Sequence, residues 1–300
     1  MAGPDHSDPT LAADWLAVCR RIADDVRAAL AHYPRPEERA RTTGRGEGGD
    51  LALAIDRAAE DVVLAELEAL GLPLTLVSEE RGHVPLAGGG PVHVVVDPID
   101  GSLNAKRRLP FHCLSIAVAS GSAMETVEFG YIAELAAGAG ASPVATGGEW
   151  WARRGEGAFA DGAPLSVLDR PDDSPAIEVL AFESANPRIV AALSDELAAT
   201  GAKRLRALGA IALALCLVAG GRADAMTSLA PCRSVDAAAG QLIVREAGGV
   251  VAFPDEREPD GSTPLDLDMR SRVMAAWRQE ELDLLLEAFG GALEREQPAR

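Results

Sequence analysis

Positive charge is scarce in this sequence. Its 300 residues contain 28 Lys and Arg against 46 Asp and Glu, which gives a formal net charge of −18 at pH 7. A chain of this charge is repelled by polyanions and by anionic surfaces. We therefore expect no nucleic acid polymer and no membrane among its partners. An anionic substrate would need a local cation to hold it.

Paired cysteines and long apolar runs are also missing. The four cysteines, Cys19, Cys113, Cys216 and Cys232, lie far apart and form no CxxC pair, so neither a zinc knuckle nor a disulfide framework is indicated. No apolar run reaches the ~18 residues of a membrane span. The N-terminus has no basic stretch followed by an apolar core. We expect a cytoplasmic protein that is neither exported nor anchored.

The chain does contain enough apolar sequence, 48% of its residues, for a full core in one large or two medium domains. Apolar residues spaced by three or four positions predict a helix from Leu11 to Leu30. The Pro- and Gly-rich segment from Tyr33 to Asp50 reads as a mobile loop, and a second helix is expected from Leu51 to Leu70. We treat residues 1–300 as a single chain.

Strand-like runs dominate the middle of the chain, and strands alternate with helices towards the end. The expected strands are 74–80, 92–97, 114–120, 125–134, 176–182, 203–208, 223–228 and 249–253. The expected later helices are 187–199, 210–218 and 236–247. This order indicates a layered α/β second half. We divide the chain into approximate halves, 1–170 and 171–300.

The stretch "VVVDPIDGSLNAK" places Asp97 and Asp100 three positions apart at the end of an apolar run. Alone, it reads as an ordinary strand-to-turn junction. Another apolar run ends in Glu79 and Glu80, however, and Asp236 stands at the start of a helix. Hard divalent cations take oxygen ligands and relieve the repulsion among such acids. The sequence therefore predicts a Mg²⁺ site.

Phosphate is the ligand that this site favours. Pro98 fixes the backbone between the two aspartates, and Ile99 can offer its carbonyl oxygen. Gly101 and Ser102 can open a helix whose free N–H groups face an anion. An acidic protein could then hold phosphate through Mg²⁺ and backbone N–H groups.

Four segments, in this order, resemble the signature segments of the inositol monophosphatase family: "GGDLALAIDRAAED", "VSEERG", "DPIDGSLN" and "LGAIALALCLVAGGRADAM…SVDAAAGQLIVREAGGVV". They extend from about residue 49 to 253, and their combination is specific where each alone would be weak. The resemblance implies the five-layered αβαβα sandwich of the inositol monophosphatase / fructose-1,6-bisphosphatase fold, an α/β class. It also implies a homodimer that hydrolyses phosphate monoesters with about two to three Mg²⁺ ions per active site.

The same resemblance assigns roles to individual residues. The positions that match metal ligands are Glu79, Asp97, the Ile99 carbonyl, Asp100 and Asp236. The positions that match the catalytic set are Asp50, Ser102 and Glu79, with Asp50 and the Ser102 hydroxyl orienting the attacking water. A free Asp has a pKa near ~3.9 and is a poor base, so Asp50 should act through Ser102 on a water acidified by metal.

Several residues near these motifs have a second interpretation. Glu80 either binds the metal itself or lies next to the residues that bind it, and we favour the second interpretation. Asp56 and Glu60 lie one helical turn apart. An exposed or capping pair is at least as good an interpretation of these two acids as a role in the site. The histidines are unclustered, and we assign them no metal.

Substrate contacts are expected from both halves of the chain. Gly101 and Ser102 are the expected phosphate-binding residues, and the expected substrate-binding residues are Asp100, Gly209, Ala210, Ser228 and Arg233. Ser228 stands where family members that act on inositol phosphate have a glutamate, and Val235 replaces a tryptophan. These departures leave inositol specificity open.

The expected activity is Mg²⁺-dependent hydrolysis of a small polyol or sugar phosphate, with inositol 1-phosphate as the first choice. The alternatives are fructose 1,6-bisphosphate, histidinol phosphate and 3′-phosphoadenosine 5′-phosphate, and Arg204, Arg206 and Arg233 would suit a second phosphate. A catalytically silent protein that binds a phosphorylated ligand is the alternative from another class.

Overall fold

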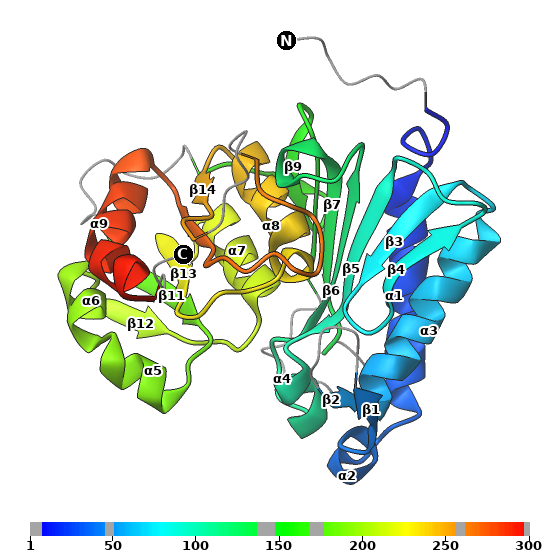
Figure 1. The fold of residues 1–300 in the computed structure, drawn as a ribbon, viewed down its shortest axis with the longest axis horizontal. Helices are drawn as coiled ribbons and strands as arrows, with labels where there is room; N and C mark the ends of the chain where they lie inside the picture. Colours follow the sequence, from blue (N-terminus) through cyan, green and yellow to red (C-terminus); the bar gives the residue numbers. More distant parts are fainter. Residues whose placement is uncertain (1–7, 46–50, 137–147, 168–176, 256–261, 297–300) are drawn as a thin grey trace.

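The computed structural model describes residues 8–45, 51–136, 148–167, 177–255 and 262–296. These residues form five layers, seen edge-on in Figure 1. Helices α1 (Trp15–Ala31) and α3 (Ala54–Ala69) cover an eight-stranded sheet, and α7 (Ile211–Ala219) and α8 (Ser234–Glu246) separate it from a five-stranded sheet. The last layer contains α5 (Pro187–Ala192), α6 (Ser194–Ala199) and α9 (Gln279–Glu296). The αβαβα sandwich expected from the sequence is confirmed.

The first sheet has the strand order β10-β9-β8-β7-β6-β5-β3-β4. Its strands are β3 (Leu74–Ser78), β4 (Gly82–Leu86), β5 (His93–Asp100), β6 (Cys113–Ala119), β7 (Val127–Glu134), β8 (Glu149–Arg153), β9 (Gly157–Ala160) and β10 (Ala163–Leu165). Only β3 and β5 are parallel neighbours, with Ser78 opposite Val96. The carboxyl ends of β3 and β5 therefore lie side by side. Glu79 comes directly after β3, and Asp97 lies near the end of β5.

The second sheet has the order β12-β11-β13-β15-β14. Its strands are β11 (Val179–Glu183), β12 (Arg204–Arg206), β13 (Ala225–Ser228), β14 (Val250–Ala252) and β15 (Met274–Ala276). β11 pairs in parallel with β12 and β13, whereas β15 pairs antiparallel with β13 and β14. All five strands are short: β12, β13 and β14 lie within the predicted strand segments, β11 extends one residue beyond its segment, and β15 was not predicted.

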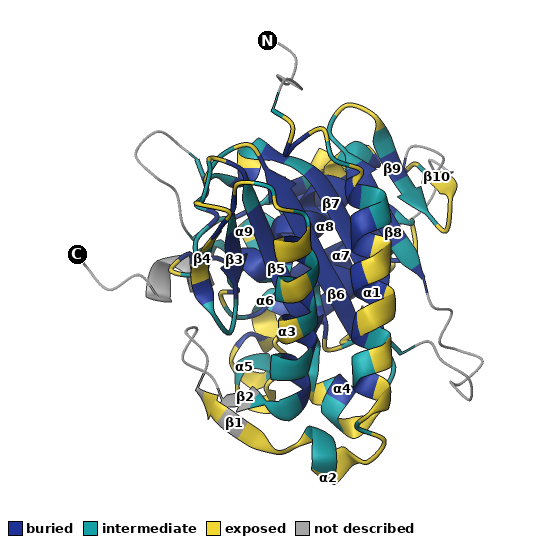
Figure 2. Ribbon diagram, turned by 90° about the vertical axis from the view of Figure 1, so that its right-hand side faces the viewer, coloured by how far each residue is buried: buried dark blue, intermediate teal, exposed yellow. Residues whose placement is uncertain are grey.

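Helix α8 is the centre of the packing. Ten of its 13 residues are buried, because it lies between the two sheets, as the dark blue interior of Figure 2 shows. Small residues allow this close approach: a Cβ at Gly130 of β7 would lie 2.8 Å from the carbonyl oxygen of Ala239, and one at Gly240 would lie 2.5 Å from Leu215 Cδ1. The middle of α8 is thereby packed closely against β7 of the first sheet and against helix α7.

Two predicted segments differ from the structure. The segment 33–50 contains helix α2 (Pro36–Arg39) and strand β1 (Thr42–Arg45), so its interpretation as a loop without secondary structure was wrong. Pro36 suits a first helical turn, and Glu38 accepts a hydrogen bond from the N–H of Arg35. The second predicted helix begins at Ala54, because β2 (Leu51–Leu53) pairs with β1.

The predicted helix 187–199 is two helices, α5 and α6, which are separated at Leu193. Leu193 has φ −106° and ψ 19°, outside the helical region, and its side chain is buried. Burial of this leucine goes together with the break in the helix. In the described part of the chain, no helix has both the length and the apolar character that crossing a bilayer requires.

Candidate active site

Four acidic residues from three elements meet at the carboxyl ends of β3 and β5. Asp97 and Asp100 are among the last four residues of strand β5, Glu79 follows β3, and Asp236 lies in the first turn of α8. Asp97 is 3% exposed. Burial raises its pKa well above the usual range, and the charges of Glu79, Asp100 and Asp236 raise it further. The fold thus brings the predicted acidic metal ligands together.

Asp100 faces the start of helix α7. Its Oδ2 accepts a 2.6 Å hydrogen bond from the N–H of Ala212, where the helix dipole favours negative charge. Burial nevertheless raises the pKa of Asp100 well above its usual value, and the charge of Asp236 raises it further. A cation placed between these acids would remove the main electrostatic cost.

The turn after β5 is held by its own backbone and side chains. The N–H of Ile99 donates to Asp97 Oδ1 at 2.9 Å, and the Ser102 hydroxyl donates to the Ile99 carbonyl at 2.9 Å. Helix α4 (Ser102–Arg107) begins after Gly101, which has φ +86°. A Cβ there would lie 2.9 Å from the carbonyl oxygen of Phe111. Glycine is therefore required at this turn.

Asp56, one of the two acids for which the sequence left a second interpretation open, lies near Ser102. It is 7% exposed, and its Oδ2 accepts a 3.1 Å hydrogen bond from the N–H of Leu53. The capping part of the predicted alternatives is therefore correct, whereas the exposed part is wrong. Burial raises the pKa of Asp56 to about 6, and the hydrogen bond from the N–H of Leu53 and the neighbouring Ser102 hydroxyl oppose that shift. Asp50, predicted for this role, lies outside the described residues.

The position of Asp56 had a weak signal in the sequence. Asp56 and Glu60 each follow a residue of the buried stripe of α3, Ile55 and Ala59. A pair of acids that repeats in step with an apolar stripe lies beside the core and not on the solvent face. Asp56 Oδ1 is buried and has no hydrogen-bond partner among the described residues. It can therefore accept a proton or a hydrogen bond from a ligand.

A second pair of acids lies behind this cluster. Glu60 is fully buried, accepts a hydrogen bond from the Ser78 hydroxyl, and lies 3.3 Å from Arg81 through Oε2 and Nε. Burial raises the pKa of Glu80 to about 7, and the neighbouring Glu79 adds to the shift. Glu60 is thus structural, and Glu80 adds negative charge next to Glu79.

Arg233 brings positive charge into the acidic cluster. Its Nη1 donates to Glu79 Oε1 at 2.6 Å, and its backbone N–H donates to Asp236 Oδ2 at 2.8 Å. Its side chain is 13% exposed and that of Glu79 is 24% exposed. The guanidinium predicted to bind substrate therefore contacts a predicted metal ligand, and substrate binding by Arg233 stays a prediction.

The loop that precedes α7 is held by Glu183 at the end of β11. This carboxylate accepts hydrogen bonds from the N–H groups of Leu208 at 3.0 Å and Gly209 at 2.7 Å. Asn104 of α4 donates to the Leu208 carbonyl at 2.7 Å. The predicted substrate residues Gly209 and Ala210 consequently lie beside the turn at Gly101, whose added Cβ would be 3.0 Å from the Gly209 carbonyl oxygen.

Ser228, also predicted to bind substrate, lies at the end of β13. It is fully buried, and its hydroxyl accepts a 3.0 Å hydrogen bond from the N–H of Val273. A substrate contact would have to compete with this bond. The role of Ser228 therefore stays a prediction.

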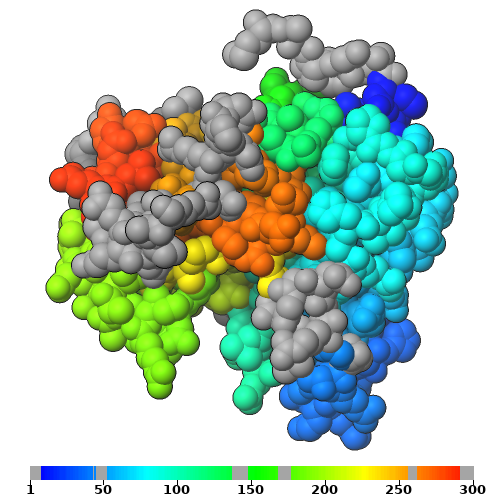
Figure 3. Space-filling model, viewed as in Figure 1, coloured from blue at the N-terminus to red at the C-terminus, as the bar shows by residue number. Residues whose placement is uncertain are grey.

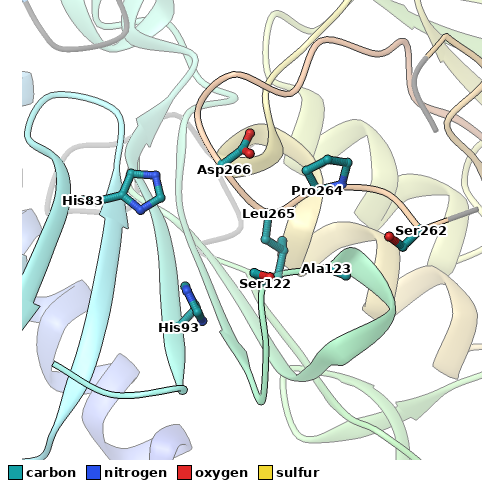
Figure 4. Close-up of a pocket in the computed structure, with 8 residues that line it drawn as sticks. All are labelled: His83, His93, Ser122, Ala123, Ser262, Pro264, Leu265 and Asp266. Carbon is teal, nitrogen blue, oxygen red and sulfur yellow. The ribbon is translucent and has the colours of Figure 1, made fainter. Parts of the chain in front are cut away.

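A separate pocket of about 220 Å³ lies between the first sheet and the loop that contains Leu265 and Asp266. Figure 4 shows His83 and His93 on the sheet and Leu265 and Asp266 on the facing loop, and the space-filling view of Figure 3 shows that loop (orange) against the strands (cyan). The residues that line this pocket include none of the predicted site residues. The two histidines thus share a pocket although they are unclustered in the sequence.

The comparison with known families decides the class of protein. Residues 12–293 match the inositol monophosphatase family. The chain belongs to this family. It is therefore a phosphoric monoester hydrolase, a class whose substrates are small phosphorylated metabolites. This confirms the family and the enzyme class expected from the sequence.

Individual relatives of this phosphatase carry more specific names. A fructose-1,6-bisphosphatase/inositol-1-monophosphatase of Methanothermobacter thermautotrophicus is 34% identical over 92% of the chain and 96% of the relative. Human inositol monophosphatase 2 is 31% identical over 90% of the chain and 86% of the relative. A crystal structure of an inositol monophosphatase–fructose 1,6-bisphosphatase matches with a TM-score of 0.72 at 25% identity, covering 92% and 100% of the two chains.

The inositol monophosphatase family is generally metal-dependent, and the residues of the phosphatase fit Mg²⁺ in chemical type. Its buried carboxylates are hard oxygen donors that repel one another. As the described side chains stand, however, no three acids, histidines or cysteines converge closely enough to hold an ion. Glu79, which contacts Arg233, would have to turn towards the other acids.

Proposed function

We propose that this phosphatase is Mg²⁺-dependent and hydrolyses sugar and polyol phosphates, including both fructose 1,6-bisphosphate and inositol 1-phosphate. The observation that carries the proposal is the hydrogen bond of the Ser102 hydroxyl to the Ile99 carbonyl, in a turn that Asp97 also holds and with the buried Asp56 nearby. Relatives named for both activities support the two substrates.

Asp56 and Ser102 are the proton-handling groups of this proposal. The Ser102 hydroxyl donates its one proton to the Ile99 carbonyl, so its oxygen can accept a hydrogen bond from an attacking water. If the hydroxyl turns towards the neighbouring Asp56, it can pass its own proton to that carboxylate and take up the proton lost by the water. With a pKa of about 6, Asp56 is better matched to a neutral solution than a free aspartate. The proton lost by the water would end on Asp56. An additional role for Asp50 remains a prediction.

The proposed metal ligands are Glu79, Asp97, Asp100, Asp236 and the Ile99 carbonyl. Bound Mg²⁺ would supply a Lewis acid for the phosphoryl oxygens and lower the pKa of a bound water. The protein's own contribution is to fix the donors: the N–H groups of Ile99, Ala212 and Arg233 each hold one aspartate in place. Such positioning reduces the reorganisation needed when substrate binds.

The substrate range follows from what surrounds the loop at Gly209. Ser228, at the position where inositol-specific relatives would carry an acid, is engaged with Val273, so strong selection for a sugar ring is not expected. Arg204 and Arg206 are exposed on the edge strand β12, next along the chain from Leu208 and Gly209. They are placed to attract a second phosphate of a bisphosphate.

A phosphate-release assay tests the function directly. The purified protein is incubated with inositol 1-phosphate, fructose 1,6-bisphosphate, histidinol phosphate and 3′-phosphoadenosine 5′-phosphate, with Mg²⁺ or with EDTA. We expect release from the first two only with Mg²⁺, and kcat/KM values within about tenfold of each other, or ~1.4 kcal/mol. Full activity in EDTA, or no release from any substrate, contradicts the proposal. The cytoplasmic location and the homodimer remain predictions.

A further inference from the structure

The ion pair of Arg233 and Glu79 joins two elements that are distant in sequence. The residues are 154 positions apart, and Nη1 of the arginine lies 2.6 Å from Oε1 of the glutamate. Glu79 follows β3 of the first sheet, and Arg233 is the N-cap of α8. At this distance the hydrogen bond is charge-assisted and occupies one oxygen of the carboxylate.

Arg233 is fixed at its backbone as well as at its guanidinium. Its N–H donates to Asp236 Oδ2, and α8 behind it is buried on nearly all sides. The guanidinium therefore reaches the acids from an anchored position. Burial and the charge of Glu79 raise the pKa of Asp236 to about 6. The backbone N–H of Arg233 and the charges of Arg233 and Arg270 oppose that shift.

A divalent cation bound by these acids would have to share the Glu79 carboxylate with the guanidinium. Carboxylate ligands approach Mg²⁺ at about 2.1 Å, so a cation on either oxygen would stand close to the positive charge of the guanidinium and be repelled by it. The arginine and the cation are thus alternative partners of Glu79.

We propose that Arg233 is an internal counter-ion that competes with the divalent cation for Glu79 and so sets the metal affinity of the enzyme. Cation binding releases the guanidinium, which then points into the site from the start of α8. The inference rests on the metal-dependent function proposed above and adds to it a residue that opposes metal binding.

Metal binding, measured without substrate, tests this inference. Calorimetric titration with Mg²⁺ alone is carried out on the wild type, Arg233→Gln and Arg233→Lys. The glutamine keeps the backbone N–H that caps α8 but removes the charge. We expect Mg²⁺ to bind Arg233→Gln about tenfold more tightly, equivalent to ~1.4 kcal/mol. The Mg²⁺ affinity of Arg233→Lys should lie between those of the wild type and Arg233→Gln, because lysine keeps the positive charge but lacks the planar guanidinium.

Two control proteins separate competition from a general change in charge. Arg188→Gln removes an exposed arginine of α5 and should leave the Mg²⁺ affinity at the wild-type value. In a Glu79→Gln background, Arg233→Gln should no longer tighten Mg²⁺ binding, since the contested carboxylate is gone. Equal tightening by Arg188→Gln, or the same tightening without Glu79, overturns the proposal.

Thermal unfolding distinguishes competition from a purely structural ion pair. Competition predicts that Arg233→Gln lowers Tm in EDTA but not in saturating Mg²⁺, whereas a structural tie lowers both equally. Unchanged or weaker Mg²⁺ binding by Arg233→Gln overturns the inference while leaving the proposed function intact, provided that the wild type binds Mg²⁺ and releases phosphate. A wild type that does neither overturns both.

Discussion

The carboxylate of Glu183 holds the backbone N–H of Gly209 at 2.7 Å, and this bond ties the end of β11 to the loop before α7. Glu183 is 1% exposed, and burial raises its pKa to about 7 although backbone N–H groups stabilise its charge. The loop beside the phosphate-binding turn is therefore held by an acid that ionises near neutral pH.

The raised pKa of Glu183 predicts a pH-dependent stability. A group whose pKa is higher in the folded protein contributes stability that is fully present below the unfolded value of 4.5 and is lost as the pH rises through about 7. Between pH 6.5 and 8, the wild type in EDTA should lose about 1 kcal/mol more unfolding free energy than Glu183→Gln. Urea titrations at the two pH values measure this.

A buried histidine acts in the opposite direction but does not affect the comparison. His112, whose pKa is lowered from 6.5 to about 4 by burial, gains stability as the pH rises through 6.5 and does so equally in both proteins. Glu80, with a pKa of about 7, contributes in the same direction as Glu183 but is present in both proteins. An equal loss in wild type and Glu183→Gln would show that Glu183 stays ionised throughout.

Gly209→Ala should destabilise the protein more than Gly201→Ala. Both glycines have positive φ, +88° and +68°, but a Cβ at Gly209 would lie 2.8 Å from Asn104 Nδ2, whereas none of the described atoms lies within 4 Å of one at Gly201. We expect about 1 kcal/mol for Gly201→Ala and about 2–4 kcal/mol for Gly209→Ala. Chemical denaturation provides the values, and similar losses for both would refute the close contact.

Ser102→Ala should lower kcat more than it raises KM. The hydroxyl donates to the Ile99 carbonyl near Asp56, so its proposed action is on the water and not on the bound substrate. We expect a loss of about 10²-fold in kcat, with Ser102→Thr retaining most of the activity because it keeps the hydroxyl. Steady-state kinetics decides: a rise in KM alone would make Ser102 a binding residue.

Asp97→Asn should have opposite effects on activity and on stability. The substitution removes one of several buried, mutually repelling charges, so in EDTA at pH 8 the free energy of unfolding should rise on the order of 1 kcal/mol. Turnover with Mg²⁺ should fall by about 10²-fold or more, because a shared metal ligand is lost. The exposed Asp195→Asn of α6 is the matched control and should change neither. A stability loss for Asp97→Asn would argue against repulsion among the acids.

Much of the first sheet could be predicted from the sequence because its strands are apolar and short. The runs around Val94, Ile116 and Phe129 are β5, β6 and β7; β6 is buried throughout, and β5 and β7 are buried at all but one position each. The acids after β3 and β5 were informative for a related reason: their apolar runs end abruptly in charge. Such a transition marks the edge of a sheet irrespective of the tertiary contacts.

Tertiary contacts explain what could not be predicted. β2 is a strand only because it pairs with β1, and its three residues alone fit a helix equally well. The burial of Asp56 depends on the turn at Ser102, 46 positions later, which no local pattern reveals. The ion pair between Arg233 and Glu79 is likewise a contact between distant segments, the end of β3 and the start of α8. Pattern thus predicts elements, whereas the pairing of distant side chains requires the fold.

The burial of α8 affects how mutational data on this enzyme should be read. Ala237, Ala238, Ala239 and Gly240 have no room for larger side chains between the two sheets, so a saturation scan scored by activity will show the whole helix as intolerant. Only Asp236 is expected to lose turnover while the protein accumulates normally in cells. Comparing abundance with turnover at each position would therefore separate the one chemical residue of this helix from its tightly packed neighbours.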